Sequence, residues 1–190
     1  MGATYSDIRK ILENVRDQYR GLCKGDIYDP KLPISKRDLV SEIYCKLRPY
    51  CLENRLYIHT EVKPSDYELG GKIPEFDLVI LSSFEKSSWL DFAVEVQNSC
   101  GKGRTEARFS SIPIEFFNTL IEVKIQSRVW DSKRDIDKLV LIRDAIRKCG
   151  RNCNCFHVLL NARGRMGDHQ RIIEYANSKG IEIIEHTNMS

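Results

Sequence analysis

The second half of the chain alternates apolar runs with stretches of helical periodicity, and this alternation constrains the possible folds more than any other feature. The apolar run LIEVKIQ (120–126) precedes a helical pattern over about 132–148, and CFHVLLNA (155–162) precedes another over 168–178. A short apolar run, IEIIE (181–185), closes the series. Strands connected through helices run parallel in one sheet and carry the helices on its faces. The alternation therefore predicts an α/β fold.

The first half of the chain contributes helices first and strands later. Apolar residues at helical spacing predict an N-terminal helix over about 6–22. A second helix begins near Ser35, with Asp38 three residues later in a variant of the capping box. Pro49 is expected to end it, because proline cannot continue the hydrogen bonding of a helix interior. Strand patterns follow at 56–62, 75–83 and 91–97.

Together these elements predict one domain over residues 1–190: a central mixed β-sheet flanked by helices, with an insert at about 84–118. The chain has 190 residues, of which 42% are hydrophobic and 30% charged, as is typical of a soluble globular domain. No apolar run approaches the roughly 18–20 residues of a membrane span, and the first residues lack an apolar signal core. We therefore expect a cytoplasmic protein without membrane association.

Positive charge is concentrated in one part of the sequence. Residues 124–171 contain 12 Lys or Arg against 5 Asp and no Glu, a balance of +7 within a chain whose net charge is +3. A basic half is the electrostatic footprint expected of a protein that binds nucleic acid. The same charges could instead form a solvated helix face, and charge alone does not separate the two interpretations.

Two acidic residues and a lysine occupy strand positions where charge needs an explanation. Asp77 lies inside the apolar run FDLVIL, where an unpaired carboxylate would be costly. Glu122 and Lys124 are two residues apart and so share one face of a strand. They could form the wet face of a half-exposed strand. Alternatively, Asp77 and Glu122 on neighbouring strands could hold Mg²⁺, with the carbonyl of Val123 as a third ligand. Lys124 would then lie beside a metal-bound water and stabilise charge on an attacked phosphate.

The order of these residues resembles that of the PD-(D/E)xK nuclease superfamily, which includes restriction endonucleases and Holliday junction resolvases. The matching positions are PEFD (74–77), EVK (122–124) and, on an earlier helix, Glu42. The resemblance implies a restriction-endonuclease-like core and Mg²⁺-dependent hydrolysis of DNA, with Mn²⁺ as a substitute. It implies Asp77 and Glu122 as metal ligands, Lys124 as the water-positioning base and Glu42 as an accessory acid. By analogy, cutting both strands predicts a homodimer.

Two of these assignments have rivals within the sequence. Glu95-Val96-Gln97 also alternates correctly and lies closer to Asp77 along the chain. We favour Glu122 over Glu95, because the EVK motif keeps the lysine and is followed by a helix and a buried strand. Glu42 and Lys46 are four residues apart on a helix, so a surface ion pair would explain both residues equally well.

Basic side chains for nucleic-acid contact are expected in the loops and helix starts that follow the parallel strands, since such loops gather at one edge of a sheet. Trp89 and Trp130 could stack on bases or pack in the core. The alternative function is a catalytically inactive DNA-binding or assembly module on the same fold; a protein unrelated to nucleic acid is the third possibility. The sequence does not identify the DNA substrate. The candidate DNA-contacting residues are Arg128, Lys133, Arg134, Arg163 and Arg165.

Overall fold

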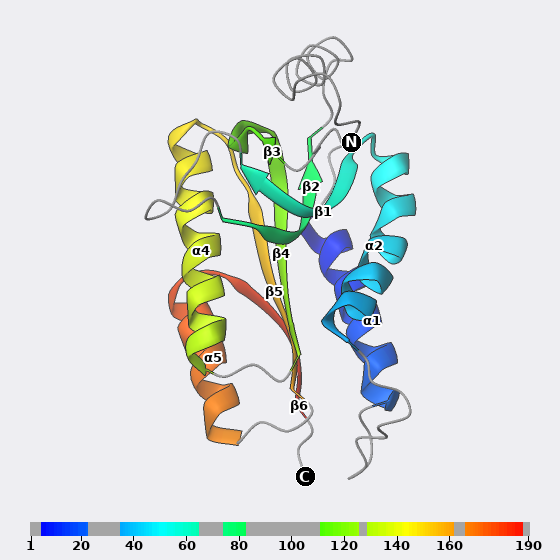
Figure 1. Cartoon of the computed structure of the whole chain (residues 1–190), viewed down its shortest axis with the longest axis vertical. Helices are drawn as coiled ribbons and strands as arrows, with labels where there is room; N and C mark the ends of the chain where they lie inside the picture. The colour runs from blue at the N-terminus through cyan, green and yellow to red at the C-terminus, as the bar shows by residue number, and fades with distance from the viewer. Residues whose placement is uncertain are drawn as a thin grey trace, which may run out of the picture.

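The computed structural model describes residues 5–22, 35–64, 74–82, 111–125, 129–161 and 166–187. These ranges form three layers, in which a sheet lies between two pairs of helices (Figure 1). The helices are α1 (Tyr5–Leu22), α2 (Lys36–Glu53), α4 (Val129–Lys148) and α5 (Met166–Ser178), with a 3-10 turn at Ile114–Phe116. The strands are β1 (Tyr57–Pro64), β2 (Phe76–Leu81), β3 (Ser111–Ile112), β4 (Phe117–Ile125), β5 (Asn154–Asn161) and β6 (Glu182–Thr187).

The sheet is mixed, and its order among the described strands is β3-β1-β2-β4-β5-β6. Strand β2 runs antiparallel to both β1 and β4, whereas β4, β5 and β6 are mutually parallel. The parallel part corresponds to the alternating second half of the sequence, where α4 and α5 supply the crossovers. The prediction of an α/β fold with a central mixed sheet flanked by helices is confirmed.

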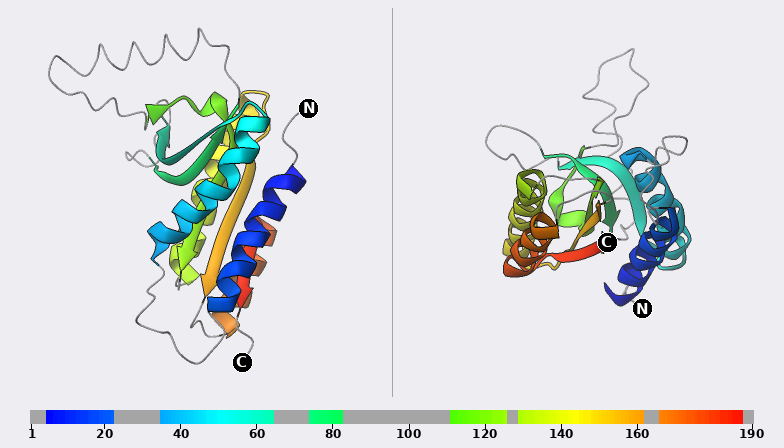
Figure 2. Two further views of the ribbon diagram at one scale, coloured as in Figure 1. Left: turned by 90° about the vertical axis from the view of Figure 1, so that its right-hand side faces the viewer. Right: turned by 90° about the horizontal axis from the view of Figure 1, so that it is seen from below.

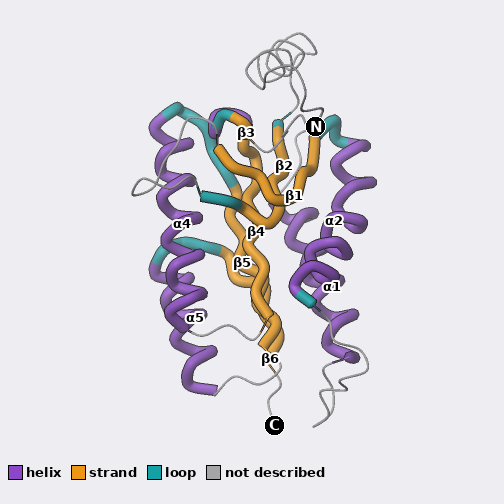
Figure 3. Tube along the Cα trace, viewed as in Figure 1, coloured by secondary structure: helices purple, strands orange, loops and turns teal. Residues whose placement is uncertain are grey.

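Each face of the sheet has its own apolar core. Helices α4 and α5 cover one face, and α1 and α2 cover the other, as the view along the sheet in Figure 2 and the orange strands between purple helices in Figure 3 show. Along β4 the side chains alternate between the two cores: Leu120 packs on the α4 side, whereas Ile121 and Val123 pack on the α2 side. Strand periodicity therefore directs Glu122 and Lys124 toward α4.

The capping box that begins α2 is present. The backbone N–H of Ser35 donates to Asp38 Oδ2 at 2.9 Å, and the backbone N–H of Asp38 donates to Ser35 Oγ at 3.2 Å. The prediction that Pro49 ends this helix is wrong, because α2 continues through Pro49 to Glu53. Proline removes a single helical hydrogen bond there, while Leu47 and Cys51 on either side of it are buried in the core.

Most other boundaries differ from the sequence prediction by one to three residues, as is usual where helix and strand ends are read from apolar periodicity. The strand predicted at 91–97 and most of the insert predicted at 84–118 lie outside the described residues. The last part of the insert is described and contains β3, the 3-10 turn and the start of β4. Within the described helices, none is both long and apolar enough to cross a bilayer.

Candidate functional site

Asp77 reaches from β2 to the backbone of β4. The paired residues of these two strands end at Leu78 opposite Ile121, and continuing this antiparallel register places Asp77 opposite Glu122. In addition, Asp77 Oδ2 accepts a hydrogen bond of 2.8 Å from the backbone N–H of Val123, the residue that follows Glu122 on β4. Opposite residues on paired strands share one face of a sheet. The register thus brings the two acids, 45 positions apart in sequence, next to one another.

The second oxygen of Asp77 is bound by a lysine from α2. Lys36 Nζ lies 2.6 Å from Asp77 Oδ1, and the Lys36 side chain is 42% exposed. Hydrogen bonding and attraction to Asp77, Glu122 and Asp135 raise the pKa of Lys36 against the opposing effect of burial, so its ammonium remains charged. Asp77 therefore has a cationic partner at one oxygen and a backbone donor at the other.

Glu122 is buried, with 2% of its surface exposed. Its Oε1 atom lies 2.6 Å from Lys138 Nζ. Burial raises the pKa of Glu122 to about 8; the Lys138 ammonium opposes this change, whereas the negative charges of Asp77 and Asp135 reinforce it. The Lys138 ammonium favours the ionised form of Glu122, whereas burial favours the protonated form. The effect of burial is larger, because nearly all of the water around the carboxyl group has been lost.

Lys124 makes its contact on α4 instead of with Glu122. Its Nζ atom lies 3.0 Å from Oδ2 of Asp135, whose side chain is 7% exposed. The lysine that reaches Glu122 is Lys138, whose ammonium also donates to the Glu75 carbonyl at 2.6 Å. Two ion pairs thus join β4 to α4, and each pairs a strand residue with a helix residue.

The charged cluster around Asp77, Glu122 and Lys124 also contains Asp135, Lys138 and His157, which sequence reasoning did not identify. Asp135 and Lys138 are three residues apart, so they lie on one face of α4, directed at the sheet. Their signal in the sequence is their position within the stripe of buried residues that includes Ile136 and Leu139. Charged residues within such a stripe need partners on the facing sheet, and Glu122 and Lys124 supply them.

His157 occupies the place beside Glu122 on β5. The two residues are paired in register, and His157 is fully buried. Neither ring nitrogen has a hydrogen-bond partner within the described part of the chain. Burial lowers the pKa of His157 to about 4, so the imidazole is neutral at physiological pH. The cluster therefore contains a buried histidine with unused donor and acceptor capacity.

The remaining predicted residues lie elsewhere or outside the described ranges. Glu42 on α2 pairs with Lys46 at 3.6 Å. Burial raises the pKa of Tyr19 on α1, and the negative charge of Glu42 adds to this effect, so Glu42 belongs to the α1–α2 interface and we leave it out of the proposed site. Lys133 lies 4.7 Å from the ring centre of Tyr175. The residues outside the described ranges are Arg128, Arg163, Arg165 and the rival motif Glu95-Val96-Gln97.

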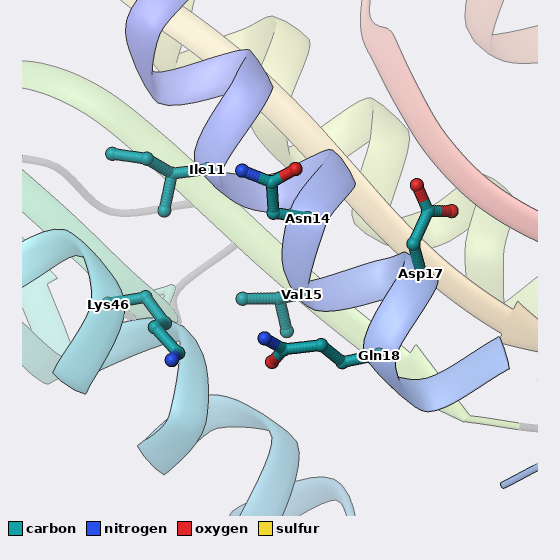
Figure 4. Close-up of a pocket in the computed structure, with 6 residues that line it drawn as sticks. All are labelled: Ile11, Asn14, Val15, Asp17, Gln18 and Lys46. Atoms are coloured by element: carbon teal, nitrogen blue, oxygen red, sulfur yellow. The ribbon is translucent and has the colours of Figure 1, made fainter. Parts of the chain in front are cut away.

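A cavity lies between α1 and α2. Figure 4 shows Lys46 of α2 directed toward Gln18 of α1, with the carboxylate of Asp17 turned away from them. None of Asp77, Glu122 or Lys124 lines this cavity, which is bounded by Ile11, Asn14, Val15, Asp17, Gln18 and Lys46. The charged cluster beneath α4 is thus separate from the cavity, whose lining contains a single carboxylate, that of Asp17.

The donor types in the cluster suit a hard cation, although the carboxylates already have ammonium partners. Glu122 Oε1 and Asp135 Oδ2 are buried and accept no well-oriented hydrogen bond from described residues, despite their contacts with lysines. Carboxylate oxygens of this kind are the preferred ligands of Mg²⁺. No group of three or more His, Cys, Asp or Glu side chains in the described ranges is already arranged around a common metal position. A cation would therefore have to replace an ammonium.

Comparisons with known proteins bear on the fold. Searches of protein-family models and of curated proteins find no match. Among solved structures, the chain is similar to NucC of P. aeruginosa ATCC27853 in its cAAA-bound form, with a TM-score of 0.50 and 12% sequence identity. The match covers 97% of this chain and 76% of that one. At this identity the likeness shows a shared fold and no more.

Proposed function

We propose that this protein is a metal-dependent DNA endonuclease that hydrolyses phosphodiester bonds through a Mg²⁺-activated water. The observation that supports it most is the approach of Asp77 to the backbone of Val123, which brings Asp77 close to Glu122 on the strand face that also carries Lys124. A carboxylate near the start of β2 and another within the buried part of β4 are costly to place in an apolar sheet unless charged or polar groups compensate them. A metal-binding role explains both acids.

The proposed division of labour follows the contacts of each residue. Asp77 and Glu122 hold the metal ion, with the Val123 carbonyl as a further candidate ligand. When bound, Mg²⁺ supplies Lewis acidity that lowers the pKa of water and neutralises charge on the attacked phosphate. Lys124 donates to the phosphate or to the attacking water, and Asp135 holds its ammonium at 3.0 Å on the α4 side of the sheet.

Binding of DNA is assigned to the basic segment that follows β4. Lys133 and Arg134 lie on the first two turns of α4, close in sequence to the site, and Arg128, Arg163 and Arg165 are further candidates in the adjoining segments. Contacts of this kind to phosphates would make the affinity depend on salt and give little sequence preference. Cutting both strands of a duplex needs two sites, so we also propose a homodimer.

One observation favours a second function, that of a catalytically inactive DNA-binding or assembly module. Lys36 and Lys138 each lie 2.6 Å from a proposed metal-binding carboxylate, so an ammonium group already lies beside each of the two acids. In an inactive module these lysine–carboxylate contacts would be permanent and would serve only to stabilise the fold. In a nuclease they would be exchanged for the cation.

Cleavage assays with matched variants separate the two functions. We expect plasmid and oligonucleotide DNA to be cut with Mg²⁺ or Mn²⁺ and to remain intact in EDTA. The variants D77N, E122Q and K124M should lose at least about 100-fold in rate, the scale of a lost electrostatic contact in a transition state. The control is E75Q, which removes the carboxylate that pairs with Lys63 at 3.0 Å, two residues before Asp77, and should leave the rate unchanged.

The results of these assays separate the nuclease from the inactive module. DNA that binds in a salt-dependent manner but stays uncut with both metals would favour the inactive module. Full activity in K124M or E122Q would reject the assignment of the site. Sedimentation velocity with and without DNA tests the homodimer.

A further inference from the structure

An exposed tryptophan lies on α4, about one and a half to two helical turns before Asp135 and Lys138. Trp130 is 58% exposed, although tryptophan is among the residues that proteins bury most extensively on average. The guanidinium carbon of Arg134 lies over its indole ring, 5.6 Å from the ring centre. Arg134 is itself exposed. An aromatic face and a cation are thus presented to solvent together.

Trp130 and Arg134 lie in line with Lys138, the residue of α4 that contacts Glu122. Trp130, Arg134 and Lys138 follow one another at intervals of four residues, so they lie along one ridge of α4. Lys138 is the residue whose ammonium contacts Glu122 at 2.6 Å. At 1.5 Å per residue, the backbone positions of Trp130 and Lys138 are about 12 Å apart along the helix axis, roughly three to four nucleotides of a stacked strand.

Base stacking and phosphate pairing are the two interactions that such a ridge can offer. Aromatic side chains in single-strand binding proteins stack on bases of any sequence, and neighbouring arginines hold the phosphates. A base that is still paired and stacked within a duplex presents no free face to a side chain. The occupant that fits both the ring and the charge is therefore an unpaired nucleotide.

We propose that Trp130 and Arg134 form a stacking platform for an unpaired nucleotide of the DNA strand that enters the site, three to four nucleotides from the cut. This inference rests on the proposed nuclease function and makes it more specific. It directs the enzyme to DNA with a single-stranded or distorted segment, such as an overhang, a bulge or a junction. Intact duplex would be cut more slowly, because a base must first be unstacked.

Other parts of α4 do not offer the same arrangement. Lys133 lies over Tyr175, whose hydroxyl donates to Asp137 at 2.6 Å, so that aromatic ring is tied into the contact between α4 and α5. Leu141 is also exposed, at 40%, but has no aromatic face. It supplies a matched control on the same helix.

The test measures binding in EDTA, so that it is independent of cleavage. A fluorescently labelled oligonucleotide of about 16 nucleotides, within the site sizes of single-strand binding proteins, is compared with versions that carry one abasic position. For the wild type, one abasic position should weaken binding by about 10-fold, within the range found for a single stacked base. W130A should weaken binding to the intact strand by a similar factor and no longer respond to the abasic position. W130F should retain the response, and L141A should match the wild type.

The spectroscopic signature comes from the indole itself. The chain has two tryptophans, so W89F leaves Trp130 as the sole indole. Its fluorescence should be quenched by the intact strand and not by the strand that lacks the stacked base. Equal binding of intact and abasic strands by the wild type, or an unchanged response in W130A, would overturn the platform. A change in sedimentation of W130A with unaltered DNA binding would also overturn it and identify the ridge as a contact between copies.

The result is separable from that for the nuclease. Base-sensitive binding without cleavage under any metal would support the platform and reject the proposed function. Cleavage that depends on Asp77 and Glu122 but shows no base-sensitive binding would reject the platform alone.

Discussion

Glu122 is the residue whose environment makes the sharpest prediction. The carboxyl group is buried, and burial raises its pKa from the usual 4.5 to about 8. In metal-free protein at pH 7 most molecules therefore carry a protonated Glu122. The variant E122Q, whose amide mimics the neutral acid in size and polarity, should accordingly fold well and keep the contact between β4 and α4.

The magnitude and sign follow from proton linkage. Between pH 4.5 and about 8 the folded protein binds a proton at Glu122 that the unfolded chain has released, so the free energy of unfolding falls as pH rises. Each pKa unit corresponds to about 1.4 kcal/mol, which gives an upper limit of about 5 kcal/mol. Water entry and local rearrangement reduce the penalty for a buried charge, and we expect a loss of about 2–4 kcal/mol at this site. The loss is complete above pH 8.

Urea unfolding in EDTA at pH 5, 6.5 and 8.5 measures this dependence. The wild type should lose stability relative to E122Q across the series, so the difference between the two should move by about 2–4 kcal/mol in favour of E122Q. E75Q, which alters an exposed carboxylate nearby, is the control and should track the wild type. A constant difference between wild type and E122Q from pH 5 to pH 8.5 would mean that Glu122 is ionised throughout, with the Lys138 ammonium fully offsetting its burial.

Three further predictions concern stability and can be measured by urea unfolding at pH 7. Ser35→Ala removes the side-chain acceptor of the capping box and should cost about 1 kcal/mol; no loss would mean that the cap is dispensable. Arg143→Met should cost about 2–3 kcal/mol, because the guanidinium donates to the carbonyls of Lys179 and Gly180, each at 2.9 Å; a neutral result would show that water replaces it. His157→Leu should gain about 1 kcal/mol by removing two buried nitrogens that have no hydrogen-bond partner among the described residues, and a loss would reveal a partner in the folded protein.

The architecture could be predicted from the sequence because its periodicities are unambiguous. Apolar runs of strand length separated by helical stripes leave few arrangements other than a parallel set of strands with helices on its faces. The short strand Ser111–Ile112 could not be predicted, because two residues carry no periodicity. Pro49 was misjudged for a related reason: a local rule about proline does not include the packing of Leu47 and Cys51, which holds the last turn in place.

The site could be predicted only in part, and the division has a physical cause. Asp77 and Glu122 were recognisable because a carboxylate in an apolar strand is costly wherever the strand lies. Their proximity depends on the register of β2 and β4, which the hydrophobic pattern alone constrains only to within an even number of residues. Asp135 and Lys138 were not recognised because a charged residue in a helix is ordinary until the face it presents to the sheet is known.

Each carboxylate of the candidate site has an ammonium partner that balances its charge where a metal would otherwise do so. The cluster has three carboxylates, Asp77, Glu122 and Asp135, and three ammonium groups, Lys36, Lys124 and Lys138, each paired within 3.0 Å. A divalent cation would add positive charge to a cluster that is already balanced or, with Glu122 protonated, already positive. The phosphates of a bound DNA strand would offset that excess, both by accepting the displaced lysines and by neutralising the cation. Under the proposed function, metal and DNA should therefore strengthen each other's binding, and the lysines that close the site in the absence of substrate become its phosphate contacts.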